Sequence, residues 1–213
     1  MKRQNGFTLI EIAIVLVIIG LLLGGVLKGQ EMITQAKIRN VANDFNGTSA
    51  AYYAYQDRYR AMPGDDPNAA TRWTAASGTV GNGDAKVSGE YNSATDTDES
   101  RLFWLDLRLA GLTAGPTSGA GAKNQPQNAA GGMTGVTSLG MFGLNGLVVC
   151  SDNLPGKIAN AIDSQFDDGV PNTGSVRAGV VPAGGATTPH TLGAAQPAYV
   201  DDGSTMYIVC KNI

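Results

Sequence analysis

Two acidic loops are the candidate metal sites in this sequence. One loop contains Asp84 and Glu90, and the other contains Asp163, Asp167 and Asp168. Carboxylate oxygens beside glycine turns are the ligands that calcium takes in proteins. Neither loop has a complete EF-hand pattern, and Asp side chains also form turns by accepting hydrogen bonds from nearby backbone N–H groups. We therefore expect structural turns at both loops, with calcium as the alternative and no other cofactor.

Catalytic residues are scarce in the chain. Its one histidine, His190, lies in a loop-like segment, and a lone loop histidine is more often solvated than catalytic. No Gly-Lys-Ser/Thr phosphate-binding motif and no cluster of metal-ligand residues occurs. The formal net charge of −3, from 15 Lys+Arg against 18 Asp+Glu, gives no general attraction for nucleic acid. We expect a protein that is not an enzyme and does not bind nucleic acid.

A carboxylate interrupts the most apolar part of the chain. The stretch Phe7–Leu27 has 21 residues, and Glu11 is its only strongly polar member. As a helix the stretch would extend about 31 Å, which matches the roughly 30 Å hydrocarbon core of a bilayer. A charge there costs at least about 2.5 kcal/mol, so Glu11 needs a partner. Lys2 and Arg3 place the start of the stretch on the cytoplasmic side.

A secretory signal peptide and a plain membrane anchor are the simpler explanations of this stretch. A signal peptide has a small-residue cleavage site after its apolar part, but no Ala-x-Ala pattern follows Leu27. Helical spacing also continues beyond the stretch without a break. A plain anchor does not explain why Glu11 is present.

The residues Gly6-Phe7-Thr8-Leu9-Ile10-Glu11 resemble the class III signal of the type IV pilin superfamily, which includes type IV pilins and the pseudopilins of type II secretion. The resemblance implies that a prepilin peptidase cuts between Gly6 and Phe7 and methylates Phe7. It also implies that Glu11 pairs with the terminal ammonium of a neighbouring subunit during filament assembly. Such a pair supplies the opposite charge that a carboxylate needs in a low dielectric.

The two cysteines, Cys150 and Cys210, lie at the ends of two segments with strand character. In an extracytoplasmic compartment a disulfide is the default state of such a pair. Their placement also resembles the disulfide-bounded C-terminal region of many pilins. Two isolated thiols and a redox pair are the alternatives, whereas a metal site would need two more ligands.

One long helix is expected to carry the N-terminal residues. Apolar and aromatic side chains recur every three or four residues beyond the membrane-length stretch, and no proline occurs before Pro63. The helix is therefore expected to continue to about Arg60. Its aromatic stripe of Tyr52, Tyr55 and Tyr59 is expected to pack under a sheet, with an electron-transfer or ligand-stacking track as the alternative.

The remaining sequence predicts an α+β fold, in which the long N-terminal helix packs against a small antiparallel sheet with long loops. Short strands are expected at 144–150 and 206–210, helices at 99–112 and directly after Pro155, and a long surface loop at 113–135. The expected parts are a leader (1–6), a transmembrane or filament-core helix (7–27), its amphipathic continuation (28–60) and an extracytoplasmic head (61–213).

These features and the resemblance predict a structural subunit of a type IV pilus-like filament. Its expected partners are other copies of itself, a prepilin peptidase, an inner-membrane assembly platform and the membrane. Its expected location is the bacterial inner membrane as a precursor pool, and then an extracellular or periplasmic filament. The alternatives are a type II secretion pseudopilin, a minor pilin that primes or decorates the filament, and a membrane-tethered binding module that never assembles.

Overall fold

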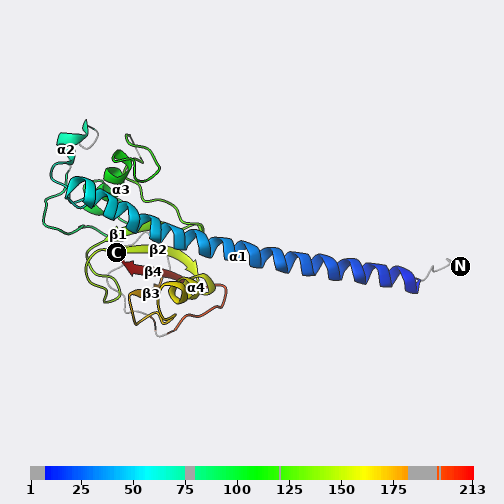
Figure 1. The fold of residues 1–213 in the computed structure, drawn as a ribbon. Helices are drawn as coiled ribbons and strands as arrows, with labels where there is room; N and C mark the ends of the chain where they lie inside the picture. Colours follow the sequence, from blue (N-terminus) through cyan, green and yellow to red (C-terminus); the bar gives the residue numbers. More distant parts are fainter. Residues whose placement is uncertain (1–7, 75–79, 120, 182–195, 197) are drawn as a thin grey trace. The chain divides into compact units, whose positions relative to one another are not determined.

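One helix dominates the N-terminal part of the chain. The computed structural model describes residues 8–74, 80–119, 121–181, 196 and 198–213. Helix α1 (Leu9–Tyr59) is continuous over 51 residues (Figure 1). The chain divides into two compact units, one that ends at Lys37 and one from Ile38 to Ile213, and α1 contributes residues to both. It ends one residue before the predicted Arg60, which adopts a left-handed backbone conformation with φ 57°.

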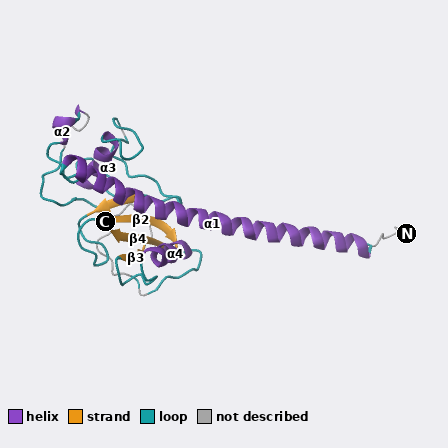
Figure 2. Cartoon of the chain, viewed as in Figure 1, coloured by secondary structure: helices purple, strands orange, loops and turns teal. Residues whose placement is uncertain are grey.

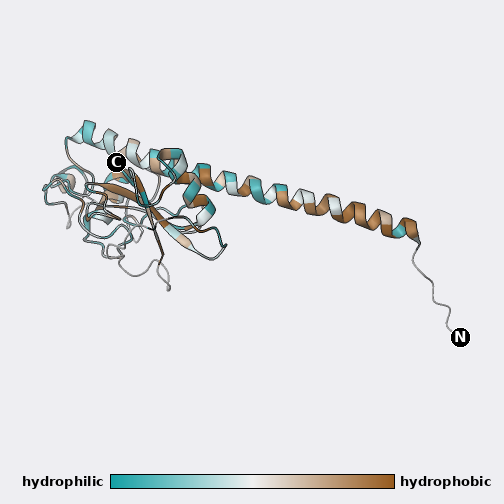
Figure 3. Cartoon of the chain, turned by 90° about the horizontal axis from the view of Figure 1, so that it is seen from below, coloured by the Kyte–Doolittle hydropathy of each residue, from teal (hydrophilic) through white to brown (hydrophobic). Residues whose placement is uncertain are grey.

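The first unit exposes its apolar side chains. From Leu9 to Leu27 the large apolar residues are between 45% and 89% exposed. Figure 3 shows hydrophobic residues along this part of the helix with few polar interruptions. An 18-residue window of α1 has a mean hydropathy of 2.8, so the helix is long and apolar enough to cross a membrane. This is consistent with a membrane-anchored precursor.

The second unit is built on one antiparallel sheet, which confirms the predicted α+β class (Figure 2). Its strand order is β1-β2-β4-β3, and each neighbouring pair is antiparallel. The strands are β1 (Thr134–Thr137), β2 (Val148–Pro155), β3 (Val176–Val180) and β4 (Met206–Asn212). The two central strands were predicted, although β2 begins four residues later than expected and extends to Pro155.

Three shorter helices complete the second unit. They are α2 (Ala69–Arg72), α3 (Glu99–Leu109) and α4 (Gly156–Phe166). Helix α3 was predicted from its apolar spacing and α4 from Pro155 and the residues after it. Helix α4 begins directly after this proline, whose fixed φ suits a helix start. Helix α3 stops before the predicted Leu112, since Gly111 has a φ of 72°.

The core of the second unit lies between α1 and the sheet. Phe45 and Tyr55 of α1 are fully buried in a cluster that also contains Val149, Leu154 and Ile162 from β2 and α4. The predicted aromatic stripe is therefore part of the core, with Tyr52 and Tyr55 buried and Tyr59 half-buried. The rings of Tyr55 and Tyr59 lie 4.6 Å apart between centroids.

The first part of the segment 113–135 is the predicted surface loop, since residues 114–119 are exposed, whereas most of 121–135 is buried or half-buried. Arg108 of α3 is 7% exposed and donates hydrogen bonds to the carbonyl oxygens of Ala122 (2.6 Å) and Asn124 (2.7 Å). Asn128 is also buried and donates to the backbone oxygen of Asp152. The end of the segment forms β1. The composition of the segment did not predict this burial, because the contacts that cause it come from residues distant in sequence.

Candidate functional site

Glu11 occupies the first turn of α1, where Thr8 partners its carboxylate. The backbone N–H and the hydroxyl of Thr8 donate to Glu11 Oε2 over 2.8 and 2.7 Å. The backbone N–H of Glu11 lies 3.3 Å from the Thr8 hydroxyl and donates back to it. This reciprocal arrangement is a capping box, which satisfies backbone donors that the start of a helix leaves free. The sequence analysis missed it, although the pattern Thr-x-x-Glu carries the signal.

The capping box leaves the charge of Glu11 uncompensated. Both bonds from Thr8 reach the same oxygen, and Oε1 accepts no hydrogen bond from the described residues. Glu11 is the only ionisable residue between Thr8 and Leu27. Side chains around it, such as Leu9 and Ile12, are apolar and exposed. One oxygen of the carboxylate is therefore available to a cation from outside the described part of the chain.

The predicted processing site lies next to this turn. Gly6 and Phe7 fall outside the described residues, so their cleavage and methylation remain predictions. His190 also falls outside them. The role of Glu11 in assembly remains a prediction as well, because the structure contains a single chain.

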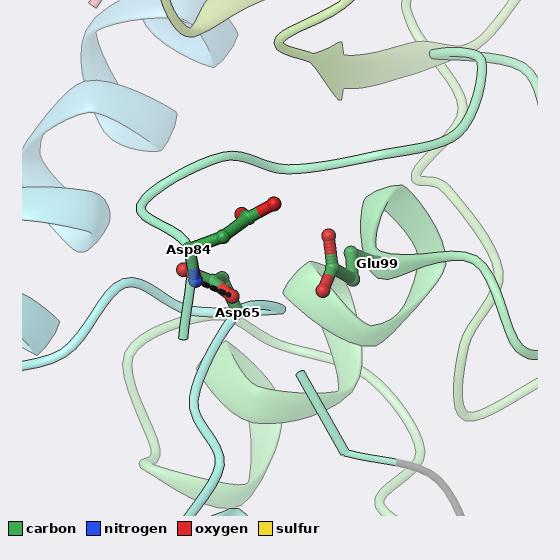
Figure 4. A group of neighbouring side chains, drawn as sticks. All are labelled: Asp65, Asp84 and Glu99. Atoms are coloured by element: carbon green, nitrogen blue, oxygen red, sulfur yellow. Dashed lines mark hydrogen bonds between the residues drawn. The ribbon is translucent and has the colours of Figure 1, made fainter. Parts of the chain in front are cut away.

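The carboxylates that lie together at the first acidic loop differ from the predicted pair. Carboxylate oxygens of Asp65, Asp84 and Glu99 lie within 4.8 Å of one another, whereas Glu90 is not among them (Figure 4). Asp65 follows the turn after α1, and Glu99 is the first residue of α3. The sequence analysis missed both residues because they are 34 positions apart and no local pattern connects them.

The two buried members of this group hold the loop around Asp84. Asp65 Oδ1 accepts from the N–H of Gly83 (2.5 Å) and Asp84 (3.2 Å), and Oδ2 accepts from Ala85 (2.7 Å). Glu99 accepts from the backbone of Asn82 and Ser88. Since backbone N–H groups already satisfy these carboxylates, their burial is explained without an ion.

Asp84 itself forms a turn, as predicted. Its Oδ1 accepts from the N–H of Lys86 over 3.0 Å, which is the Asx pattern of a side chain bonded to the backbone two residues on. Glu90 is half-buried near Asp98, and burial followed by that neighbouring charge raises its pKa. The turn interpretation of Asp84 is thus confirmed, and calcium remains untested.

The second acidic loop brings Asp163, Asp167 and Asp168 together at the end of α4. Asp163 is fully buried and accepts from the Tyr199 hydroxyl (2.6 Å), and burial raises its pKa. Asp167 accepts from the backbone N–H of Val176 (3.0 Å). Asp168 accepts from the Thr173 hydroxyl and from the backbone, and these bonds lower its pKa. These contacts again are those of structural turns.

A further buried carboxylate, that of Asp106, accepts a hydrogen bond from the turn that follows α1. Asp106 of α3 is 3% exposed and accepts from the N–H of Gly64 over 2.7 Å. Gly64 has a φ of 85°, and a Cβ there would lie 2.4 Å from the Glu99 carbonyl oxygen, so only glycine fits. Burial raises the pKa of Asp106 to about 7. The nearby Asp66 is also buried, accepts from the Tyr55 hydroxyl and pairs with Arg72.

The structure contains a disulfide between Cys150 and Cys210. These residues face each other on the central strands β2 and β4 with their Cα atoms 4.0 Å apart, and both are fully buried. The predicted disulfide is therefore present. It joins two strands that are 60 positions apart in the sequence.

The comparison with protein-family models finds one N-terminal motif. Residues 1–27 match the model described as the prokaryotic N-terminal methylation motif. Comparisons with curated proteins and with solved structures give no match. The matched residues include Gly6, Phe7 and Glu11 and end where the apolar stretch ends, so the match concerns the N-terminal segment alone.

Proposed function

We propose that this chain, which carries a prokaryotic N-terminal methylation motif on a long apolar helix and so fits a type IV pilin-like protein, is a structural subunit of a type IV pilus-like filament. A prepilin peptidase cuts it between Gly6 and Phe7 and methylates Phe7. The processed chain waits in the inner membrane and then assembles through the N-terminal part of α1. This role is structural and not enzymatic.

The single observation that carries the proposal is the position of Glu11. It is a lone carboxylate in the apolar part of α1, with one oxygen bonded to Thr8 and the other without a partner among the described residues. A carboxylate at membrane depth requires an opposite charge or a strong set of hydrogen bonds. Cleavage at Gly6 creates an ammonium at Phe7, and the ammonium of a neighbouring subunit supplies the opposite charge.

Processing also removes an obstacle to assembly. Lys2 and Arg3 precede the cleavage site, so an uncut chain would bring two cations into an apolar filament core. Burial of unpaired cations is strongly unfavourable. Cleavage therefore removes two charges that oppose assembly and creates the one charge that Glu11 requires.

The second unit forms the outer surface of the filament in this proposal. Its buried disulfide supports an extracytoplasmic location, since disulfides persist in oxidising compartments. Most of its large apolar side chains are buried by its own sheet and helices. It can thus remain folded while the N-terminal part of α1 exchanges lipid for neighbouring subunits.

The test compares Glu11→Gln with Glu31→Gln in the native host. Glu31 lies on the same helix beyond the apolar stretch, where it is exposed and pairs with Lys28, so it serves as the matched control. We expect the Glu11 variant to be cleaved and membrane-bound but at least tenfold depleted from sheared surface filaments. The control should assemble normally. Intact mass and N-terminal sequencing of each fraction measure processing and assembly separately.

The same measurement distinguishes the competing functions. Wild-type protein in sheared filaments with methylated Phe7 supports a pilus subunit. Processed protein that never appears in the sheared fraction contradicts a surface pilus and favours a pseudopilin. An intact Met1 in the assembled material, or normal filaments from Glu11→Gln, would overturn the mechanism.

A further inference from the structure

A cavity of about 540 Å³ with polar and apolar lining residues lies in the second unit. Its walls come from separate parts of the chain, among them α3 with Arg101, the 124–127 segment and the middle of β2. The volume falls within the range of roughly 300–1,000 Å³ that small-molecule sites occupy. The proposed filament role does not use this cavity.

A bulge in β2 shapes one wall of the cavity. The pairing of β2 with β4 shifts register between Ser151 and Leu154, and Asn153 adopts φ 56° within the bulge. A bulge of this kind changes the direction of side chains on the strand and is frequent beside binding sites. Asparagine adopts the left-handed conformation more readily than most residues, so Asn153 suits this position of the bulge.

Carboxamide side chains dominate the polar lining. Asn124, Gln127 and Asn153 all line the cavity. The carboxamide of Gln127 and the Oδ1 of Asn153 take part in no hydrogen bond with the described residues, and Asn153 Nδ2 makes only a long bond of 3.4 Å to Ala130. A carboxamide offers both donors and acceptors. Gln127 is exposed and Asn153 is half-buried, so these donors and acceptors face solvent and are available to a ligand.

The charged residues that line the cavity have partners, and among their described polar atoms the Nε of Arg101 is buried without a hydrogen-bond partner. Arg101 pairs with Asp96 over 2.8 Å and donates to Asn124 over 2.7 Å. The Asp152 carboxylate accepts from the N–H of Met133 (2.7 Å) and from the Tyr91 hydroxyl (3.2 Å). A charged ligand would have to compete with these contacts. The lining therefore favours a neutral ligand.

We propose that this cavity binds a neutral saccharide. A sugar hydroxyl both donates and accepts, so it matches the donors and acceptors of Gln127 and Asn153. Met133 and Val181, which also line the cavity, offer apolar surface to the C–H face of a sugar ring. Binding would give the second unit a ligand of its own, whether or not the chain assembles into a filament.

The test uses the full-length protein in lauryldimethylamine oxide, because detergents with sugar headgroups would compete for the cavity. The probe is an immobilised array of neutral and sialylated glycans, followed by calorimetry with the best-retained neutral oligosaccharide. We expect retention of at least one neutral glycan. Retention of none, or of sialylated glycans alone, overturns the proposal. Because the test needs no assembly, its outcome is independent of the filament function.

Two variants locate the binding in the cavity. Gln127→Ala and Asn153→Gly should each weaken binding by about three- to tenfold, the effect of losing one hydrogen bond. Glycine suits the left-handed conformation at position 153, so that variant should fold, which a thermal melt checks. Gln56→Ala, in a separate cavity, is the control and should bind as wild type. Unchanged affinity in both test variants would refute the assignment.

Discussion

The two units use the same helix in opposite ways. In the first unit, Leu21 of α1 is 73% exposed, whereas in the second unit Phe45 of the same helix is fully buried. The second unit covers its apolar face with its own sheet and α4. No described residue covers the apolar side chains of the first unit, and in the proposed function lipid or other subunits cover them. One continuous helix therefore has its apolar face covered in the second unit and exposed in the first.

The largest difference in the free energy of unfolding is expected between two side-chain truncations, one in each unit. Phe45→Ala should lower the free energy of unfolding of the second unit by about 3–5 kcal/mol, because it leaves a cavity in the core. Leu21→Ala should change it by less than about 0.5 kcal/mol. Urea unfolding of the detergent-solubilised chain, followed by the fluorescence of Trp73 and Trp104, measures this unit alone. Equal effects of the two truncations would contradict the division.

Removal of the disulfide tests what holds the second unit together. The double variant Cys150→Ala/Cys210→Ala should lose roughly 4 kcal/mol of stability, by the loop-entropy estimate for a closed loop of this length. The helical signal of the first unit should stay unchanged. Urea unfolding by fluorescence and by circular dichroism measures the two effects. Parallel loss of both signals would show that the units do not respond separately.

Asp106 should make the stability of the second unit depend on pH. Its pKa is raised to about 7 in the folded protein from a reference value of 3.8, so the folded state binds more protons between these values. Stability should therefore fall as pH rises from about 4 to about 7 and stay level above, by about 2–4 kcal/mol. Asp106→Asn should flatten this difference. Unfolding curves at pH 4.5, 6 and 7.5 for both proteins provide the test.

Calcium is expected to have the smallest effect. The carboxylates of Asp65, Glu99 and Asp163 already accept hydrogen bonds from the protein. Addition of 1 mM calcium or of a chelator should thus move the melting temperature by no more than about 1 °C. A larger rise with calcium that Asp84→Asn or Asp168→Asn abolishes would instead assign an ion site to that loop.

The sequence predicted the features that depend on nearby residues. The apolar stretch, Glu11 and the helical spacing are local patterns, and they predicted α1 to within one residue at its C-terminal end. Helices α3 and α4 have their own apolar periodicity. The capping box of Thr8 and Glu11 is equally local, since it depends on two residues three positions apart.

Other features depend on residues distant in sequence. The edge strands β1 and β3 are short and were missed, because their pairing with β2 and β4 defines them. Asp65, Asp106 and Arg108 gave no local signal, since these side chains bond backbone atoms that lie 18, 42 and 14 positions away. The Gly, Ser and Asn content of the loops that contain their partners predicted exposure to solvent.

The sequence by itself determined the features of the N-terminal segment: a methylation motif, a membrane-length apolar stretch and one carboxylate within it. These are linear patterns, and an isolated helix displays them without tertiary contacts. Only the tertiary structure decided which face of α1 is covered, which carboxylates are buried and where the cavity lies. Burial and pKa depend on neighbours in space, and the chain brings those neighbours together only when it folds.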